Sequence, residues 1–287
     1  MVALKRRTVG GHIAAVAKRL GAAGIDEPRL EAQVLFCHAL GLDRAALLGA
    51  NERQLNNGEY RHLERLASRR SEREPMAYIL GEREFWSLNF HLGPEVLIPR
   101  PDSETVVEAV LNARPGRGEK IRILDLGTGS GCLLLALMSE FSEAEGIGTD
   151  ASFRAVVSAQ ANARRLGLDD RARFVCADWG SALAGPFDVI VANPPYIAEG
   201  VIDDLAPEIA RYEPRLALSS GEDGMDCSRE LAPHLAGLLA ASGLAAVEIG
   251  AGQAGAVSKI FAEHGLVVAE RRRDLAGVER CLVFVHD

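Results

Sequence analysis

The sequence predicts an α/β protein in which a small helical bundle precedes a doubly wound, mainly parallel β-sheet. The first observation is that strand-like apolar runs alternate with helix-like segments from residue 121 onward. The second is that apolar residues recur at helical spacing throughout residues 1–75. The third is a glycine-rich turn between the first strand and the first helix of the alternating part, which is typical of doubly wound folds.

Residues 1–75 are predicted to form a bundle of four short helices. Apolar spacing predicts one helix from His12 to Leu20 and a second from Arg29 to Leu40, which begins after a proline and ends at a glycine. A short helix around residues 44–48 and a charged helix over residues 59–70 complete the bundle. We find no catalytic constellation in these helices.

Residues 76–100 are predicted to be a β-hairpin connector between the bundle and a second domain in residues 101–287. Alternation and aromatic residues between Phe85 and Leu92 predict a strand or hairpin, and three prolines punctuate the chain that follows. The alternative that this hairpin is an edge of the second domain stays open.

The second domain is predicted to alternate strands with helices. Its predicted strands are residues 121–126, 146–150, 172–176, 189–192, 244–249 and 281–285, and its predicted helices are residues 132–141, 155–166 and 254–264. The arginine run 271–273 is interpreted as a solvated loop.

Composition limits the classes of partner. The formal net charge of the 287-residue chain is −8, which does not support generic attraction to nucleic acid or to an anionic membrane. Five cysteines at wide spacing, without a CxxC pair, predict free thiols in a reducing cytoplasm and no metal site. No apolar stretch reaches membrane-span length, and no signal peptide is recognised. We therefore expect a cytoplasmic monomer with no membrane partner and no direct nucleic-acid partner.

The glycine-rich turn predicts a cofactor site. It contains Gly127, Thr128, Gly129, Ser130 and Gly131, and its glycines let the backbone turn tightly and let a ligand approach it closely. The N-terminus of the helix that follows favours a negatively charged group such as a carboxylate. Asp150 ends the second strand about twenty residues later, where an acidic residue binds ribose hydroxyls in adenosine cofactors.

The details of this turn favour S-adenosylmethionine over NAD. The spacing is Gly-x-Gly-x-Gly rather than the Gly-x-Gly-x-x-Gly of dinucleotide folds, and Asp125 lies two residues before the first glycine. S-adenosylmethionine has a carboxylate and no pyrophosphate, which suits this spacing. Trp179 follows the third strand and has an indole ring that fits an adenine, although ordinary core packing explains it equally well.

The tetrapeptide Asn193-Pro194-Pro195-Tyr196 follows the fourth strand and predicts the acceptor of the transferred group. Two prolines stiffen the backbone where the strand ends. The Asn193 side chain and the Pro194 carbonyl offer two acceptors for one planar NH2 group, and the Tyr196 ring can stack on that group. A plain turn is the alternative, since Asn and Pro favour turns for local reasons. The glycine loop upstream favours methyl transfer to a planar nitrogen.

These motifs resemble those of the amino-methyltransferases. The segments Glu84–Leu88 and Leu97–Glu104 narrow the resemblance to the bacterial peptide chain release factor N5-glutamine methyltransferases, the PrmC/HemK family. The resemblance covers nearly the whole chain, and Ser103 stands where the family commonly has Thr. It implies an S-adenosylmethionine-dependent Rossmann-like fold with an antiparallel last strand. It also implies methylation of the glutamine in the Gly-Gly-Gln motif of class 1 release factors.

The resemblance also implies roles for individual residues. S-adenosylmethionine would contact Gly127, Thr128, Gly129, Ser130, Gly131, Asp150, Trp179 and Asn193. The glutamine would be held by Asn193, Pro194, Pro195 and Tyr196, with Asn193, Pro194 and Tyr196 acting in catalysis. The helical bundle would dock the release factor.

The main alternative is a nucleic-acid methyltransferase that acts on an exocyclic amine, N6 of adenine or N2 of guanine. Such enzymes present a similar planar NH2 group to a similar tetrapeptide, but they bind phosphates and extrude the base from a duplex. The acidic net charge and the lack of a basic stripe count against this alternative. A nucleotide-dependent oxidoreductase leaves the tetrapeptide unexplained, and two intact motifs argue against a non-catalytic binding module.

Overall fold

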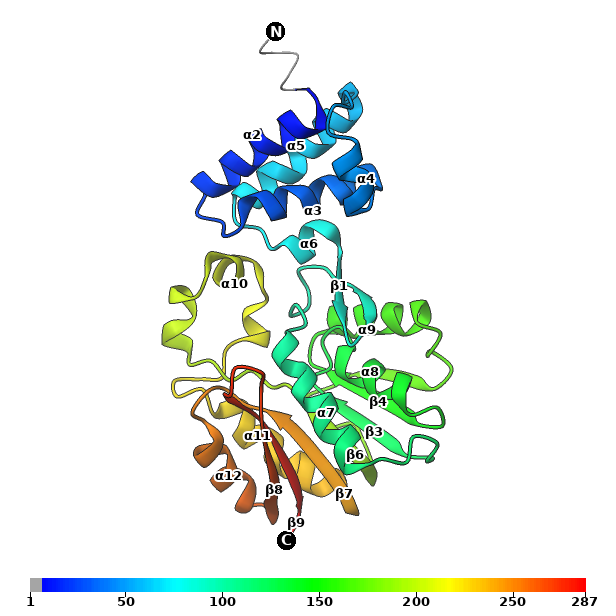
Figure 1. The fold of residues 1–287 in the computed structure, drawn as a ribbon. Coiled ribbons are helices and arrows are strands. Elements are labelled where there is room, and N and C mark those ends of the chain that lie inside the picture. Colours follow the sequence, from blue (N-terminus) through cyan, green and yellow to red (C-terminus); the bar gives the residue numbers. More distant parts are fainter. Residues whose placement is uncertain (1–6) are drawn as a thin grey trace. The chain divides into compact units, whose positions relative to one another are not determined.

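The computed structural model describes residues 7–287, which divide into two compact units (Figure 1). The first unit contains the described residues up to Gly81 together with Ala206–Tyr212. The second contains Glu82–Leu205 and Glu213–Asp287. A short segment from the second half of the chain therefore belongs to the N-terminal unit.

The first unit is helical, and the four predicted helices are present. Its helices are α2 (Val9–Ala22), α3 (Pro28–Leu40), α4 (Arg44–Gly49), α5 (Asn57–Ser71), α6 (Met76–Leu80) and α10 (Pro207–Tyr212). Apolar side chains of α2, α3 and α5 form its core, with Leu20, Phe36 and Leu63 buried. Asn56 and Glu59 form a capping box that fixes the start of α5.

Two arginines of the first unit, one of them buried, hold α10 in that unit. The Arg70 guanidinium donates to Glu208 Oε1 at 3.0 Å, and Arg73 donates to Glu208 Oε2 at 2.7 Å. Arg70 also forms a two-pronged ion pair with Glu31. Because Arg70 is nearly inaccessible to solvent, these carboxylates are what makes its burial tolerable.

The second unit is built on a seven-stranded sheet with the order β5-β4-β3-β6-β7-β9-β8. The strands are β3 (Arg122–Leu126), β4 (Glu145–Asp150), β5 (Ala172–Cys176), β6 (Phe187–Ala192), β7 (Leu239–Glu248), β8 (Leu266–Arg273) and β9 (Glu279–His286). Neighbouring strands from β5 through β7 pair in parallel, whereas β9 runs antiparallel to both β7 and β8. The prediction of a mainly parallel sheet with an antiparallel last strand is confirmed.

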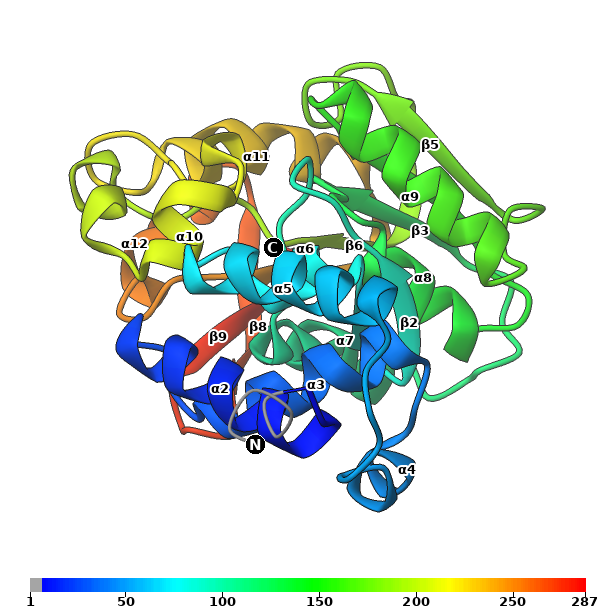
Figure 2. The same ribbon diagram turned by 90° about the horizontal axis from the view of Figure 1, so that it is seen from above.

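Helices cover both faces of this sheet (Figures 1 and 2). One face is covered by α7 (Glu104–Ala113), α8 (Cys132–Glu140) and α9 (Phe153–Arg165), and the other by α11 (Asp226–Leu238) and α12 (Ala254–Ala262). The central strands β3 and β6 are therefore apolar on both faces, as the sequence indicates. The order of the strands reverses between β3 and β6, and in such sheets ligands bind outside the carboxyl ends at that point.

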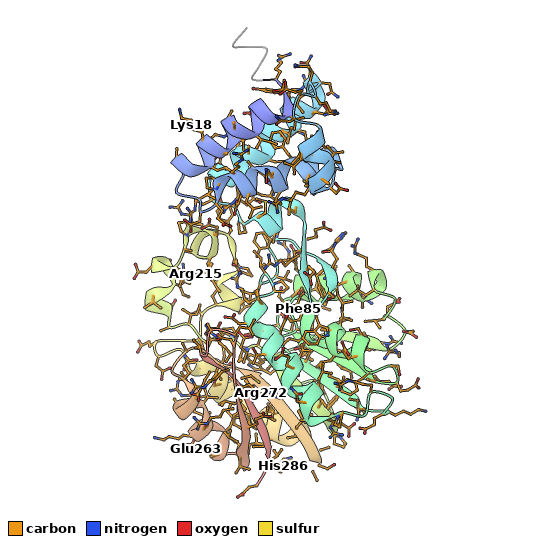
Figure 3. All side chains as sticks on the ribbon, viewed as in Figure 1. Lys18, Phe85, Arg215, Glu263, Arg272 and His286 are labelled. Atoms are coloured by element: carbon orange, nitrogen blue, oxygen red, sulfur yellow. The ribbon has the colours of Figure 1, made fainter. Side chains whose placement is uncertain are left out.

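A two-stranded hairpin of β1 (Glu82–Phe85) and β2 (Leu88–His91) precedes the sheet and belongs to the second unit. Trp86 and Ser87 form its turn, and both have positive φ angles, 52° and 58°. Such turns match the twist of a tight hairpin. Phe85, labelled in Figure 3, is buried and lies with its ring edge-on to that of Phe90.

Asn162 of α9 anchors this hairpin beside the glycine-rich turn. The Asn162 side chain accepts a hydrogen bond from the His91 amide at 2.8 Å, and it donates to the carbonyl of Ser130 at 2.9 Å. A fully buried amide with these partners fixes both segments at once.

The interpretation of residues 271–273 as a solvated loop is wrong, because they end the edge strand β8 (Figure 3). Their side chains pair with Glu270 and Glu279 rather than projecting freely. Charged residues suit an edge strand, since they discourage pairing with another chain. They also interrupt the alternation of apolar and polar residues by which a strand is recognised in the sequence.

The described residues also contain short 3-10 turns. The turns are η1 (Pro101–Ser103), η2 (Glu199–Asp204) and η3 (Arg215–Ala217). Among residues 7–287, no helix is both long enough and apolar enough to cross a bilayer.

Candidate active site

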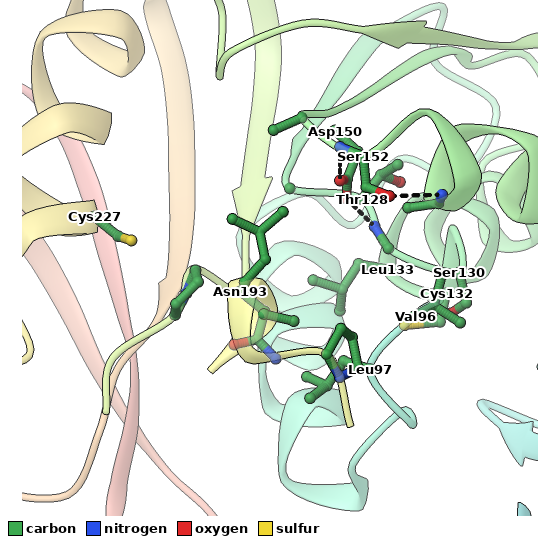
Figure 4. Close-up of a pocket in the computed structure, with 18 of the residues that line it drawn as sticks. Val96, Leu97, Thr128, Ser130, Cys132, Leu133, Asp150, Ser152, Asn193 and Cys227 are labelled. Carbon is green, nitrogen blue, oxygen red and sulfur yellow. Dashed lines mark hydrogen bonds between the residues drawn. The ribbon is translucent and has the colours of Figure 1, made fainter. Parts of the chain in front are cut away.

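A cavity of about 250 Å³ lies in the second unit where β3, β4, β5 and β6 end (Figure 4). Its walls come from the turns after these strands, from residues 95–103 before α7, and from residues 214–219 around η3. An open α/β sheet binds ligands at this edge. Most of the residues that carried the sequence prediction therefore meet in one cavity.

Glycine is required for different structural reasons at different positions of the turn after β3. Gly127, Gly129 and Gly131 all have positive φ angles, 77°, 54° and 82°, which disfavour any other residue. A Cβ atom at Gly129 would meet no other atom within 4 Å, so this backbone borders open space. A Cβ at Gly131 would lie 3.1 Å from Leu135 and 3.3 Å from Ala159. Gly129 therefore leaves room at the cavity, and Gly131 permits close helix packing.

Asp150 is tied to this turn by its carboxylate. Oδ2 accepts a hydrogen bond from the Gly129 amide at 2.9 Å, and Oδ1 accepts one from the Ser152 amide at 2.8 Å (Figure 4). Burial raises the pKa of Asp150, and the two amides act in the opposite direction. Each oxygen keeps a further lone pair, so the group can accept from a pair of neighbouring hydroxyls.

Asp125 lies beneath the turn and is almost inaccessible to solvent. Its Oδ2 accepts a hydrogen bond of 2.7 Å from the Thr128 hydroxyl. Burial raises the pKa of Asp125 to about 7, although the Thr128 hydroxyl and the Leu134 amide lower it. Asp125 therefore stabilises the conformation of the glycine-rich turn through its hydrogen bond with Thr128.

The residues of the turn fit the carboxylate end of S-adenosylmethionine. Ser130 lines the cavity, and its buried Oγ has no hydrogen-bond partner among residues 7–287. The helix α8 begins at Cys132, and its N-cap Gly131 offers no side-chain hydrogen bond, so the positive end of the helix favours an anion there. An unpartnered hydroxyl beside an uncapped helix start is a suitable place for a carboxylate.

Trp179 lies against the glycine-rich turn in a strained conformation. Its φ angle is 44°, which is unusual for an aromatic residue, and its Nε1 donates to Glu230 Oε2 at 3.2 Å. A Cβ at Gly127 would lie 3.5 Å from the indole ring. Strained backbone conformations cluster at active sites and ligand-binding sites, and Trp179 is one of the residues that line the cavity.

Asn193 lines the cavity with its amide nitrogen already engaged. Nδ2 donates to Ser103 Oγ at 3.1 Å, which leaves Oδ1 as an acceptor. Pro195 also lines the cavity, whereas Pro194 and Tyr196 are not among its lining residues. The acceptor role of the Pro194 carbonyl and the stacking role of the Tyr196 ring therefore stay predictions.

Two family models match this chain, the PrmC N-terminal domain over residues 13–81 and the methyltransferase small domain over residues 103–221. A release factor glutamine methyltransferase of Rhodospirillum rubrum is 49% identical over 92% of this chain and 81% of that protein. One of Agrobacterium fabrum is 39% identical over 96% of this chain and 97% of that protein. The chain belongs to the release factor glutamine methyltransferase family. The predicted family is confirmed.

Solved structures agree on the fold. The ribosomal protein L11 methylase of Lactobacillus delbrueckii subsp. bulgaricus has a TM-score of 0.50 at 19% identity, covering 68% of this chain and 84% of that one. A 16S rRNA N2 G1207 methyltransferase of T. thermophilus has a TM-score of 0.51 at 20% identity, covering 72% and 49%. The Rossmann-like fold of S-adenosylmethionine-dependent methyltransferases is confirmed.

Tyr196 is held from several sides in this family member. Its hydroxyl donates to Glu248 Oε1 at 3.4 Å, and its carbonyl accepts from Gln253 Nε2 at 2.9 Å. A Cβ at Gly224 would lie 2.6 Å from that carbonyl oxygen, so a larger residue is excluded there. Burial raises the pKa of Tyr196 to about 12, which keeps the phenol protonated at neutral pH.

Sequence reasoning missed the partners that position the cavity wall before α7. Arg100 lines the cavity and forms a 2.5 Å ion pair with Glu213, which is buried. Glu213 also accepts from the Ile98 amide at 3.4 Å. Arg100 lies in a segment that the sequence analysis singled out, but its partner is 113 residues away and no local pattern marks it.

Within residues 7–287, no cluster of three or more His, Cys, Asp or Glu side chains is arranged to hold a metal ion. All five cysteines are unpaired. Cys132 and Cys227 both line the cavity, and burial raises the pKa of each thiol, which makes them poor nucleophiles at neutral pH.

Proposed function

We propose that this chain transfers the methyl group of S-adenosylmethionine to the side-chain amide nitrogen, N5, of a glutamine in a class 1 peptide chain release factor. The observation that carries the proposal is Asn193, which borders the cavity with its NH2 group engaged by Ser103 and its oxygen free to accept. Membership of the release factor glutamine methyltransferase family supports the substrate. The glutamine of the Gly-Gly-Gln motif is the proposed target.

The cofactor would be held by the residues around the glycine-rich turn. The turn from Gly127 to Gly131 would contact its amino-acid end, Asp150 would accept from its ribose hydroxyls, and Trp179 would pack on its adenine. When bound, S-adenosylmethionine supplies a methyl group on a sulfonium, which is a strong electrophile. The protein therefore has to hold and orient the nucleophile rather than activate the donor.

The tetrapeptide after β6 would orient the glutamine amide. An amide nitrogen is a poor nucleophile because its lone pair is delocalised into the carbonyl. Asn193 Oδ1 and the Pro194 carbonyl would accept its two hydrogens, turn its lone pair toward the methyl group and stabilise the positive charge that develops on nitrogen. Pro195 would stiffen this arrangement, and the Tyr196 ring would stack on the amide plane.

Alignment is the largest contribution expected from the protein. Holding two reactants in line supplies up to roughly 7–11 kcal/mol of a barrier. The proton leaves after methyl transfer, when the nitrogen is strongly acidic, so the reaction needs no dedicated base.

We also propose the domain roles and the setting of the reaction. Residues 1–75 dock the release factor, residues 76–100 connect them to the catalytic domain, and residues 101–287 catalyse the reaction. The chain acts as a monomer in the cytoplasm without binding nucleic acid directly. Its acidic net charge and its unpaired cysteines support this setting.

The test is methyl transfer from radiolabelled S-adenosylmethionine to a purified class 1 release factor. A release factor with the Gly-Gly-Gln glutamine changed to alanine is the control, and total RNA and DNA are assayed in parallel. We expect label on the unmodified factor and none on the control. Label on nucleic acid alone would assign the chain to the exocyclic-amine alternative.

A further inference from the structure

Glu248 is a buried carboxylate next to the substrate tetrapeptide that the proposed chemistry does not use. It ends β7, and only 1% of its surface is exposed. Its Oε1 accepts from the Tyr196 hydroxyl at 3.4 Å, and its Oε2 has no partner within hydrogen-bonding geometry in the described chain. A buried ionisable group is costly unless it is paired and hydrogen-bonded, so an unpartnered carboxylate oxygen needs an explanation.

Ser103 bonds to Asn193 and also acts on the charge state of Glu248. The Ser103 side chain is buried, and its Oγ accepts from Asn193 Nδ2 at 3.1 Å. The Ser103 hydroxyl also lowers the pKa of Glu248, against the larger effect of burial, so it favours the ionised carboxylate. A serine hydroxyl has one proton to donate. While Oγ accepts from Asn193, that proton is free to turn toward Glu248, whose Oε2 has no other partner among residues 7–287. Turned that way, the proton would join the three side chains in one line of hydrogen bonds.

The direction of this line decides which atom of Asn193 faces the cavity. The oxygen and nitrogen of an asparagine amide have nearly the same shape, so packing alone does not orient the group. A carboxylate only accepts, which forces Ser103 to donate to it and to accept from Asn193 Nδ2. Asn193 Oδ1 is then left for the substrate. A protonated Glu248 could instead donate to Ser103. The Asn193 side-chain amide would then no longer be held in one orientation by its hydrogen bond to Ser103.

We propose that Glu248 is a positioning residue that acts through Ser103 to keep the Asn193 side-chain oxygen facing the substrate amide. This inference rests on the proposed function for the identity of that substrate. The negative charge behind Asn193 also polarises its amide, which strengthens Oδ1 as an acceptor while positive charge develops on the substrate nitrogen.

The groups around Glu248 determine its pKa and therefore the pH above which it is ionised and accepts from Ser103. Burial raises the pKa of Glu248 to about 7, Asp102 adds to that rise, and Arg280 together with the Ser103 and Tyr196 hydroxyls opposes it. Arg280 also forms ion pairs with Asp102 at 3.3 Å and with Asp274 at 2.9 Å. Cys281, which pairs with Glu248 across the β7–β9 ladder, and Tyr196 both have raised pKa values and stay protonated near pH 7.

The first experiment observes Asn193 without substrate or cofactor. The side-chain amide NMR signals of Asn193 are recorded from about pH 5 to about pH 9 in the full chain and in Glu248→Gln. We expect the signals of the unmodified protein to shift with a midpoint near the pKa of Glu248, and those of Glu248→Gln to show no such shift. Identical titrations in both proteins would overturn the proposal. This readout does not depend on the release factor, so it stands even if the proposed substrate fails.

The second experiment separates positioning from a merely structural role. Turnover with a release factor is measured for Glu248→Gln, Ser103→Ala, Ser103→Thr and the double variant Glu248→Gln/Ser103→Ala. We expect kcat to fall roughly 10- to 100-fold in Glu248→Gln and Ser103→Ala, the range for residues that orient a reacting group from behind. The KM for S-adenosylmethionine should stay within about twofold. Ser103→Thr, which keeps the hydroxyl, should retain activity.

The double variant decides whether Glu248 works through Ser103. If it does, the double variant loses no more activity than Ser103→Ala alone, because the line is already broken. Glu140→Gln is the matched control, since Glu140 accepts from the Trp86 indole at 2.8 Å outside the cavity, and it should leave kcat unchanged. Multiplicative losses in the double variant would overturn the proposal.

Discussion

Asn193 and Ser103 lie 3.1 Å apart, from amide nitrogen to hydroxyl oxygen, although 90 residues separate them in the chain. This contact joins the tetrapeptide after β6 to the turn before α7. It also orients the Asn193 side chain, which is proposed to accept from the substrate amide. The chemistry of the site therefore depends on a contact between two motifs rather than on either motif alone.

Replacing Asn193 by alanine should remove most turnover. The substitution deletes the acceptor expected to stabilise the developing charge, and losing one such group typically lowers kcat by about 10²- to 10³-fold. The affinity for S-adenosylmethionine, measured by isothermal titration calorimetry, should change only modestly. Near-normal turnover of this variant would refute the acceptor role.

Replacing Asp150 by alanine should act mainly on cofactor binding. A charge-assisted hydrogen bond contributes about 1.5–3 kcal/mol, so the Kd for S-adenosylmethionine should rise roughly 10- to 150-fold. Asp150→Asn keeps one acceptor oxygen, so its Kd should lie between those of the unmodified protein and Asp150→Ala. Calorimetry gives each Kd, and an unchanged Kd in Asp150→Ala would show that the carboxylate only supports the loop.

Gly131→Ala should destabilise the protein more than Gly129→Ala. Both substitutions place a side chain at a positive φ angle, which costs about 1–2 kcal/mol. Only at Gly131 does the new methyl group also press on Leu135 and Ala159. Urea denaturation of the two variants measures the difference, and equal losses would contradict the packing role of Gly131.

Glu248→Gln should change how stability depends on pH. Because the folded-state pKa of Glu248 is raised from 4.5 to about 7, the native state binds more protons than the unfolded state between those values. The contribution of this group to stability therefore falls as pH rises through that window. The variant should gain stability relative to the unmodified protein between about pH 5 and about pH 8, as measured by urea denaturation. A constant difference would place the folded-state pKa near its ordinary value.

The parts of the site that lie within one strand–turn–helix unit were predictable from the sequence. The glycine-rich turn, Asp150 and Asn193 each follow a buried apolar strand, and parallel strands bring their carboxyl ends to one edge of the sheet. Short-range periodicity and turn chemistry are enough to place them.

The contacts that tune the site were not predictable, because they join residues far apart in sequence. Glu213 pairs with Arg100 and Glu248 bonds to Tyr196 across 113 and 52 residues. No local pattern encodes such pairs. The strand β8 was missed for a different reason, since its arginines satisfy the needs of an exposed edge and conceal the alternation.

Mass spectrometry can locate the transferred methyl group on the substrate and so decide whether this chain is a glutamine methyltransferase. A class 1 release factor is incubated with this chain and S-adenosylmethionine, digested and fragmented. We expect one added methyl group on the side-chain amide of the Gly-Gly-Gln glutamine, and far less of it when Asn193→Ala replaces the unmodified enzyme. A methyl group on any other residue of the release factor, or an unmodified factor beside methylated nucleic acid, would contradict it.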